Sequence, residues 1–321
     1  MENAKFIISL DFELDWGVYD VKNATYDQNI IGARYAIPKI LDLFNAYDIS
    51  ATWATVGMLF NKDKQSFIKY KPSKTPSYIN QKLNSYQINI GIDEENDPYH
   101  YAYSLIKLIQ QYPGQEIASH SYSHYYTTEP GQTSEEFRED IQAAKKIATD
   151  LFNTDIKSFV FPRNLMNENY LTILSDLNFC AYRGNPKHWA YIRGENKNFF
   201  IRVYRFIDIF FNLSGYLCHP NLETDDIKNI PASRFLRPFI KIKLFNYLML
   251  NRIKSEMLYA AKNNLMYHLW WHPHNFGINT KENLKNLKTI LEYSHQLKKS
   301  YNMQSVTMYD YSISCTQSSL S

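Results

Sequence analysis

Cysteine is scarce in this chain of 321 residues, and the three that occur lie far apart, at Cys180, Cys218 and Cys315. An odd number of widely spaced cysteines provides no disulfide framework and favours a reducing compartment. The first five residues contain no basic segment, long apolar core or small-residue cleavage site, and they lead directly into an apolar run. We therefore expect a cytoplasmic protein without a signal peptide.

Long apolar runs and concentrated charge are also missing. No apolar stretch approaches 18 residues without a charge, so a transmembrane helix is not expected. The net charge is only +3, and acidic and basic residues are mixed along the chain. This argues against nucleic-acid binding, because that function needs a concentrated basic face. No repeat, low-complexity block or dividing linker is present. We therefore predict one domain over residues 1–311 and a flexible tail over residues 312–321.

Hydrophobic residues make up 45% of the chain, which is enough for a sizeable core. Aromatic residues reach 16%, and although most are expected in that core, flat rings also line clefts that bind sugars. Strand-like and helix-like patterns alternate, which predicts a parallel α/β architecture. The predicted strands cover residues 6–10, 51–56, 116–119, 158–161, 179–182, 199–211, 265–271 and 306–308. The predicted helices cover residues 31–46, 99–111, 133–151, 167–177 and 280–299.

Three local features modify this scheme. Residues 61–98 are polar and lack a clean period, which predicts an insertion over one end of the fold that can act as a lid. Arg234–Lys254 is basic and amphipathic, so it fits a helix at a membrane surface or, as we favour, a helix packed on the barrel with a solvated basic side. Pro38 lies within a predicted helix and marks a start or a kink there.

The most informative stretch is an apolar run that ends in His120 and is followed four residues later by His124. A helical turn after His120 would put both imidazoles on one face, where they could bind a divalent metal. The competing interpretation is a pair of core or surface histidines, because nine histidines will sometimes lie four apart by chance. A catalytic metal normally has a third protein ligand.

Polar residues follow the predicted ends of five strands: Asp11, His120, Arg163, Arg183 and His272. Active sites of (β/α) barrels lie at the carboxyl ends of the strands, so these side chains are expected to converge on one mouth.

Two carboxylates lie at the end of the first strand. Asp11 and Glu13 are two residues apart, so on an extended chain they share a face while Phe12 points away. One of them can bind a metal with the histidines, and the other can take a proton from metal-bound water. The alternative is a loop cap or an ion pair with Arg163.

The run Leu269–His274 supplies the candidates for a general acid. Strand alternation places His268, Trp270 and His272 on one face, and His268 lies deeper, where a core histidine is expected. His272, at the mouth, is the better acid, and His274 is the second choice. A neighbouring carboxylate would raise the pKa of the imidazole and favour the protonated form that an acid needs.

These motifs resemble those of the polysaccharide deacetylase family, chitooligosaccharide-deacetylase-like carbohydrate esterases. His120–His124 matches the family's His-Ser/Thr-x-x-His motif in full, and the resemblance extends from Phe6 to Gly277. Ser9–Glu13 aligns with the family's first motif but departs from it, because Phe12 replaces a metal-binding Asp. Phe161–Asn164 stands in place of the third motif, Arg-x-Pro.

The resemblance implies an α/β fold, a distorted barrel of seven or eight β/α units, and a defined set of roles. His120 and His124 would bind a divalent metal, with Glu13 as the third ligand. Asp11 would be the catalytic base and His272 the general acid.

The resemblance also implies an arginine that orients the base. Arg163 is the candidate for this role, and Arg183 is its competitor. We further expect Arg183, Trp271 and His274 to contact the substrate.

The implied reaction is metal-dependent hydrolysis of the N-acetyl group of an amino sugar in a polysaccharide or glycan precursor, with release of acetate. Zn²⁺ is the expected metal, with Co, Mn and Ni as alternatives. One competing function is a metal-independent amidohydrolase of the same superfamily acting on a cyclic amide or ureide, which Phe12 favours. Another is an inactive carbohydrate-binding relic. A cytoplasmic location favours a precursor substrate, and residues 234–254 suit peripheral contact with the inner membrane face.

Overall fold

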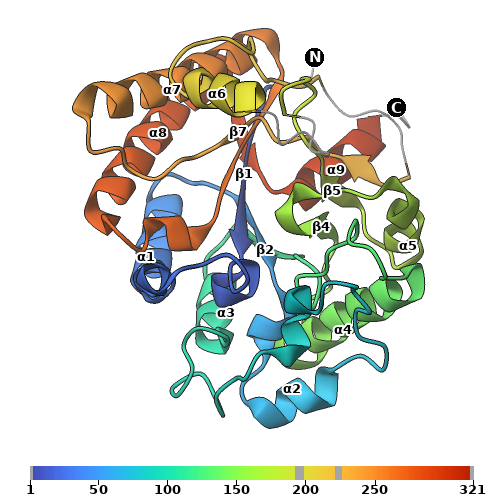
Figure 1. The fold of residues 1–321 in the computed structure, drawn as a ribbon. Helices are drawn as coiled ribbons and strands as arrows, with labels where there is room; N and C mark the ends of the chain where they lie inside the picture. Colours follow the sequence, from blue (N-terminus) through green and yellow to red (C-terminus); the bar gives the residue numbers. More distant parts are fainter. Residues whose placement is uncertain (1–2, 192–198, 221–225, 319–321) are drawn as a thin grey trace.

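The computed structural model describes residues 3–191, 199–220 and 226–318. Within these ranges the chain forms a curled sheet of parallel strands with helices around it (Figure 1). The order of the sheet is β6-β5-β4-β3-β2-β1-β8-β7, and β9 pairs with the first half of β1. The predicted parallel α/β fold is therefore confirmed, and the barrel is distorted into a curled half-barrel.

The described strands are Lys5–Phe12 (β1), Ala51–Thr55 (β2), Gln115–Ser119 (β3), Ser158–Val160 (β4), Ala181–Arg183 (β5), Lys228–Asn229 (β6), Arg234–Phe235 (β7), Met266–Trp271 (β8) and Gln304–Val306 (β9). The α-helices are Asp27–Ala46 (α1), Lys64–Tyr70 (α2), Tyr103–Gln110 (α3), Ser134–Phe152 (α4), Leu171–Asp176 (α5), Phe199–Asp208 (α6), Lys243–Asn263 (α7), Thr280–Tyr301 (α8) and Met308–Ser318 (α9). Short 3₁₀ helices cover Leu14–Gly17 (η1), Ala24–Tyr26 (η2), Gly57–Phe60 (η3), Gln81–Leu83 (η4), Ser85–Gln87 (η5), Pro162–Asn164 (η6), Glu168–Tyr170 (η7) and Pro273–Phe276 (η8).

Strand β1 runs through the middle of the sheet, between β2 and β8, and both of its faces are buried. The face toward the helices is apolar throughout and comprises Phe6, Ile8, Leu10 and Phe12. The face toward the inside of the barrel changes along the strand from Ile7 to Ser9 to Asp11, and all three are buried. This change from apolar to polar places the chemistry at the carboxyl end of the sheet.

Residues 199–211 were predicted as a strand, and this prediction was wrong, because residues 199–208 form helix α6. Partial alternation of apolar and polar residues suggested a strand. The apolar residues at positions 199, 203, 206 and 207 also follow the spacing of one helical face, and that spacing describes the segment correctly.

Two predictions about helix ends also need correction. Helix α1 runs from Asp27 to Ala46 with Pro38 inside it, so the helix does not begin at the proline. The tail predicted to be flexible from residue 312 is helical to Ser318, because Met308 and Tyr311 of α9 are fully buried and anchor the helix. Residues 319–321 lie outside the described ranges.

The predicted insertion, residues 61–98, lies against the loop that follows β3. The hydroxyl of Tyr78 accepts a hydrogen bond of 2.7 Å from the backbone N–H of Tyr126, and Ser85 donates one of 3.0 Å to the carbonyl of Ser123. The segment therefore braces this loop. Two cavities lie at the carboxyl end of the sheet and are described below. Their lining residues all come from outside residues 61–98, so a lid role stays a prediction.

The basic stretch from Arg234 to Lys254 is not one continuous helix. It begins as β7, continues as a loop and enters α7 only at Lys243. From Met249 onward, α7 buries one side against α8 and β8, which is the packed arrangement that we favoured. None of the described helices is both long enough and apolar enough to cross a bilayer.

Helix α4 begins with a capping box. The Thr133 side chain accepts a hydrogen bond from the backbone N–H of Glu136, and the Glu136 carboxylate accepts one from the backbone N–H of Thr133. These two bonds satisfy donors that the helix itself cannot.

We therefore expect Thr133→Ala to lower the free energy of unfolding by about 1 kcal/mol. The matched control is Thr289→Ala within α8, where the hydroxyl donates to the carbonyl of Lys285 in the preceding turn and caps no helix end. Urea denaturation followed by circular dichroism measures both. Equal effects of the two substitutions would contradict the assigned cap.

Candidate active site

Polar residues from separate strands meet at the carboxyl end of the sheet, as predicted. Asp11 lies near the end of β1 and Glu13 follows that strand, whereas His120 comes directly after β3. Arg183 closes β5, and His272 comes directly after β8. Polar contacts of 2.6 to 3.7 Å connect all five, with Arg183 on Asp11 and His272 between Asp11 and Glu13.

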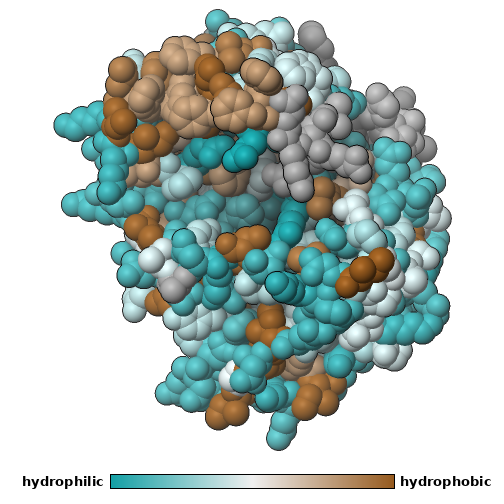
Figure 2. Space-filling view, viewed as in Figure 1, coloured by the Kyte–Doolittle hydropathy of each residue, from teal (hydrophilic) through white to brown (hydrophobic). Residues whose placement is uncertain are grey.

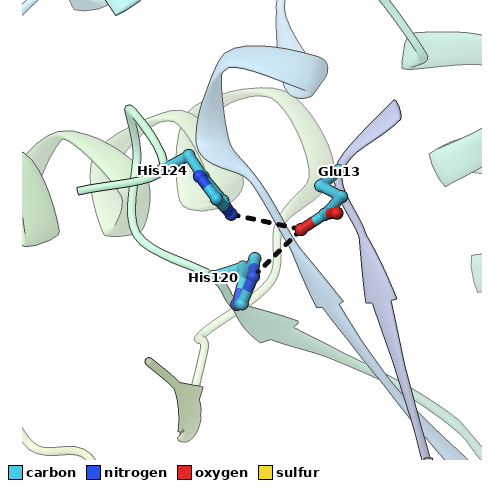
Figure 3. Close-up of side chains that lie close together, drawn as sticks. All are labelled: Glu13, His120 and His124. Atoms are coloured by element: carbon cyan, nitrogen blue, oxygen red, sulfur yellow. Dashed lines mark hydrogen bonds and ion pairs between the residues drawn. The ribbon is translucent and has the colours of Figure 1, made fainter. Parts of the chain in front are cut away.

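Glu13, His120 and His124 form a compact group of possible metal ligands (Figure 3). The Nε2 atoms of His120 and His124 lie 3.3 and 3.1 Å from Oε2 of Glu13. All three side chains are buried, and one ligand atom from each lies within 4.8 Å of the others. Two imidazoles and one carboxylate make a known set of protein ligands for catalytic zinc.

Hydrogen bonds on the far side of the rings indicate which nitrogens face Glu13 as acceptors. Nδ1 of His120 lies 2.8 Å from the carbonyl of Val160, and because a carbonyl only accepts, this nitrogen carries the proton. In the neutral form of the ring, Nε2 of His120 is therefore unprotonated and faces the carboxylate. Burial lowers the pKa of His124 despite the neighbouring Glu13, which also favours its neutral form. Acceptors that face one another in this way fit a cation between them.

The loop that carries the two histidines is not a helical turn, so the imidazoles come together by another route. Ser121 and His124 adopt positive φ angles of 60° and 57°, which non-glycine residues rarely do. Asp140 of α4 holds the loop in place by accepting hydrogen bonds from the backbone N–H groups of Tyr122 and Ser123, at 2.6 and 3.1 Å. The imidazoles still approach each other, with ring centroids 5.0 Å apart, because tertiary hydrogen bonds shape the loop.

Asp11 is held by Arg183 in a bidentate ion pair. The two guanidinium nitrogens lie 2.6 and 2.7 Å from the two carboxylate oxygens, and both side chains are buried. Arg183 also donates to Ser9 and Asn164, at 2.9 and 2.8 Å. Burial raises the pKa of Asp11, but the charge and hydrogen bonds of Arg183, together with the nearby His120 and His272, outweigh burial, so the pKa lies below its ordinary value.

The two arginines therefore take different roles from those predicted. Arg163 pairs with Asp20 at 2.5 Å, lies over the ring of Tyr126 and lines a cavity, whereas Arg183 orients Asp11. The Arg183 side chain is fully buried against Asp11, and its contact with substrate stays a prediction. The third motif was expected to supply the orienting arginine, but Arg163 adopts a positive φ in η6 and its side chain reaches Asp20 instead.

The three late histidines separate into distinct environments. Nε2 of His272 lies 3.7 Å from Asp11 and 3.5 Å from Glu13, and the side chain is 24% exposed to the cavities. His268 is fully buried and bonded to the Ser9 hydroxyl at 2.8 Å, as predicted for a core histidine.

His274 stacks on His272, with ring centroids 5.0 Å apart. Burial is the main reason that the pKa of His274 falls to about 3, so its ring is neutral near pH 7. It lines one of the two cavities, which is consistent with the predicted contact with substrate but not with service as a general acid.

Two cavities of ≈ 290 and ≈ 280 Å³ adjoin the site and share Asn164, Phe235, Trp270 and His272 in their walls. Trp271 was predicted to contact the substrate, and this was wrong, because it is fully buried near Phe44 and Phe276. Its neighbour Trp270 faces the cavities, on the same side of β8 as His272. The alternation of side chains along the strand already indicated that Trp270, and not Trp271, shares a face with His272.

The sequence analysis also missed residues whose hydrogen bonds fix the positions of the candidate site residues. Asn164 accepts a hydrogen bond from Arg183, Ser9 links Arg183 to His268, and Asp140 shapes the histidine loop. No local motif distinguishes these residues. Their partners lie far away in the sequence, so only the folded chain reveals their roles.

The chain belongs to the polysaccharide deacetylase family. The family model, described as polysaccharide deacetylase, matches residues 22–182, half of the chain. This range contains both histidines of the His120–His124 motif. It begins after Asp11 and Glu13 and ends before His272, so the assignment of these three residues to the site rests on the geometry described above. A search of curated proteins found no match.

Solved structures share this fold at low sequence identity. A Mycobacterium smegmatis protein assigned as a polysaccharide deacetylase matches with a TM-score of 0.61 and 12% identity, covering 100% of this chain and 93% of its own. A Pseudomonas aeruginosa PAO1 protein assigned likewise matches with a TM-score of 0.58 and 11% identity, covering 96% and 89%. Puue allantoinase gives a TM-score of 0.58 and 14% identity, covering 96% and 88%. These likenesses show the fold.

Asp15 lies outside the cluster, in η1, and belongs to a second group of charges. Its carboxylate is 2.5 Å from Lys22 and 3.2 Å from Nε2 of His100, whose Nδ1 is 2.8 Å from Asp97. Burial opposes the protonation of His100, but the two carboxylates outweigh it and raise the pKa of His100 from 6.5 to about 8.

His100 is therefore expected to make stability depend on pH. Because its pKa is higher in the folded state, the stabilisation is complete below pH 6.5 and is lost as the pH rises through about 8. We expect the deficit in unfolding free energy of His100→Gln to be about 2 kcal/mol larger at pH 6 than at pH 9. Denaturant titrations at both values measure this, with the exposed His295→Gln as control. A deficit independent of pH would contradict the assignment.

Proposed function

We propose that this protein removes the N-acetyl group from an amino sugar in a polysaccharide or glycan precursor, by metal-dependent hydrolysis that releases acetate. Membership of the polysaccharide deacetylase family supports the reaction class. The observation that carries the proposal is the set of Glu13, His120 and His124, whose acceptor atoms face one another beside the ionised Asp11.

Glu13, His120 and His124 are the residues that would hold the metal, which we propose is Zn²⁺, with Co, Mn or Ni able to replace it. The carbonyl of Val160 orients His120, and the hydroxyl of Tyr126, 3.1 Å from Nδ1, does the same for His124. A bound divalent metal would polarise the acetyl carbonyl and lower the pKa of a water molecule.

Asp11 is the proposed general base. Its carboxylate is ionised at neutral pH because Arg183 keeps its pKa below the ordinary value, so it can accept the proton that the attacking water loses. The two hydrogen bonds from Arg183 also prevent the carboxylate from rotating away. Arg183 therefore acts by positioning Asp11.

His272 is the proposed general acid. It stands between Asp11 and Glu13 and is exposed to both cavities, so a proton on its ring can reach a leaving group there. As water adds to the acetyl carbon and the C–N bond breaks, His272 would give its proton to the departing amine. The products are acetate and a free amino sugar.

The wall of the larger cavity suits a sugar ring. Trp270, Phe235 and Tyr191 provide flat aromatic surfaces, and Asn185 and Arg237 provide donors for hydroxyl groups. The metal-independent alternative was favoured by Phe12, where the family has a metal-binding Asp. Phe12 packs in the core against Trp53, and Glu13 supplies a carboxylate on the required face instead.

The first test is metal content by plasma mass spectrometry on protein purified without an affinity tag. We expect about one equivalent in the wild type, and about a tenfold or greater loss of affinity in His124→Ala because a ligand is removed. His295→Ala, an exposed histidine on α8, is the matched control and should retain the metal. Little metal in the wild type after reconstitution with Zn²⁺ or Co²⁺ would refute the proposed site.

The second test separates catalysis from metal binding. Asp11→Asn should keep the metal and lower acetate release from N-acetylated sugar oligomers by about 10²- to 10⁴-fold, because an amide cannot accept the proton. Asp150→Asn, at an exposed position on α4, is the control. Activity close to that of the wild type in Asp11→Asn would exclude Asp11 as the base.

A further inference from the structure

Helix α6 presents its apolar side to solvent, the reverse of the usual arrangement for an amphipathic helix. Phe199, Phe200, Val203, Phe206 and Ile207 recur at the spacing of one helical face, and all five are exposed. The exposed fraction reaches 77% for Phe200. A face of this kind marks an interaction surface when it is contiguous and cannot fold inward.

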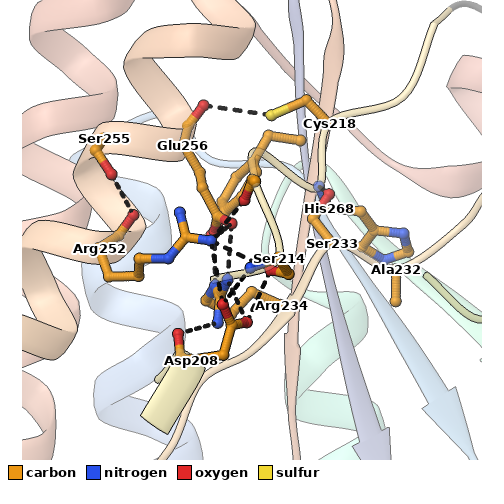
Figure 4. Close-up of polar contacts among 12 residues, drawn as sticks. Asp208, Ser214, Cys218, Ala232, Ser233, Arg234, Arg252, Ser255, Glu256 and His268 are labelled. Atoms are coloured by element: carbon orange, nitrogen blue, oxygen red, sulfur yellow. Dashed lines mark hydrogen bonds and ion pairs between the residues drawn. The ribbon is translucent and has the colours of Figure 1, made fainter. Parts of the chain in front are cut away.

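A buried group of charges fixes the opposite side of α6 (Figure 4). Asp208, at the end of the helix, is fully buried and lies 3.3 Å from Arg234 and 3.7 Å from Arg252. Both arginines also pair with Glu256 of α7, at 2.6 and 3.1 Å. Separating such deeply buried charges is strongly unfavourable. Rotation of α6 to bury its apolar side would break these pairs, so the outward orientation is built into the fold.

The exposed apolar surface continues from α6 onto the start of α7. Phe210, just after α6, lies against Phe245 of α7 with ring centroids 4.9 Å apart. Ile242 and Leu244 are 60% and 62% exposed. We call this surface the α6–α7 apolar face, and Figure 2 shows its brown and tan side chains gathered over these helices. It comprises Phe199, Phe200, Val203, Phe206, Ile207, Phe211, Leu213, Ile242, Leu244, Phe245 and Tyr247.

The exposed charges among these apolar residues are basic. Arg202, Arg237, Lys241 and Lys243 are exposed, and residues 199–207 and 235–255 contain neither Asp nor Glu. Apolar side chains that enter the boundary between headgroups and acyl chains, together with cations that attract lipid phosphates, are the two requirements for binding at an anionic bilayer surface. A second copy of this chain would place these cations against one another.

We propose that the α6–α7 apolar face binds the surface of an anionic phospholipid bilayer. The face adjoins the candidate active site, because Arg205, Ile209 and Arg237 line the larger cavity together with Trp270 and His272. Docking therefore places the cavity beside the lipid headgroups. If the deacetylase activity proposed above holds, this position suits an acetylated sugar attached to a membrane lipid, whereas the docking itself does not depend on that activity.

Vesicle co-sedimentation tests the proposal. The probe is extruded vesicles of phosphatidylcholine with 25% phosphatidylglycerol at low salt, compared with phosphatidylcholine alone. We expect the wild type to sediment with the anionic vesicles and to be released at high salt, because screening weakens the attraction. The double variant Phe206→Ser, Leu244→Ser should lower the partition coefficient at least tenfold. So should Lys241→Glu combined with Lys243→Glu.

The matched control is Ile68→Ser with Ile92→Ser, which removes two exposed apolar residues outside the α6–α7 apolar face and should leave binding unchanged. Metal content and acetate release from a water-soluble substrate should be equal in all variants, so a failure of the enzymatic proposal is distinguishable from a failure of docking. Failure of the wild type to sediment would overturn the proposal. Equal loss of binding in the control would also overturn it. A third contradicting result would be a wild-type dimer in light scattering that the Phe206→Ser, Leu244→Ser variant dissociates and the other variants do not.

Discussion

The ion pair between Arg183 and Asp11 is the interaction on which the candidate site depends. Both side chains are buried, and buried charges persist only when a partner and further hydrogen bonds replace the lost water. Here the carboxylate receives two bonds from one guanidinium, and Ser9 and Asn164 satisfy additional donors of the arginine. The pair joins β1 to β5 across the inside of the barrel, so the same contact that holds the fold together keeps Asp11 ionised and in one orientation.

Glu13, two residues further along, has a different set of partners and therefore a different chemistry. Within the part of the chain that the structure describes, Glu13 pairs with no arginine; it faces His120 and His124, with His272 on its other oxygen. Because His120 donates its proton to the carbonyl of Val160, the nitrogen near Glu13 is an acceptor when the ring is neutral. The division of labour that we propose between a base and a metal ligand follows from these partners, because the two carboxylates are otherwise chemically alike.

Most of the fold was predictable because its signals are local. The apolar runs of β1, β2, β3 and β8 and the capping box of α4 are readable from neighbouring residues, and the structure has them where the sequence indicated. Helix α6 was the main error. Hydrophobic burial normally decides between helix and strand, but here the apolar residues face outward and the buried residue that fixes the helix is Asp208, whose partners in β7 and α7 lie far along the chain.

The sequence by itself determined which residues meet at the candidate site: alternation put Asp11 and Glu13 on one face, spacing paired His120 with His124, and strand ends brought His272 to the same edge. Only the tertiary structure decided what the remaining candidates do. It gave the role of orienting Asp11 to Arg183 instead of Arg163, and it buried Trp271. The physical reason is that periodicity depends on adjacent residues, whereas an ion pair or a cavity wall depends on which distant strands become neighbours.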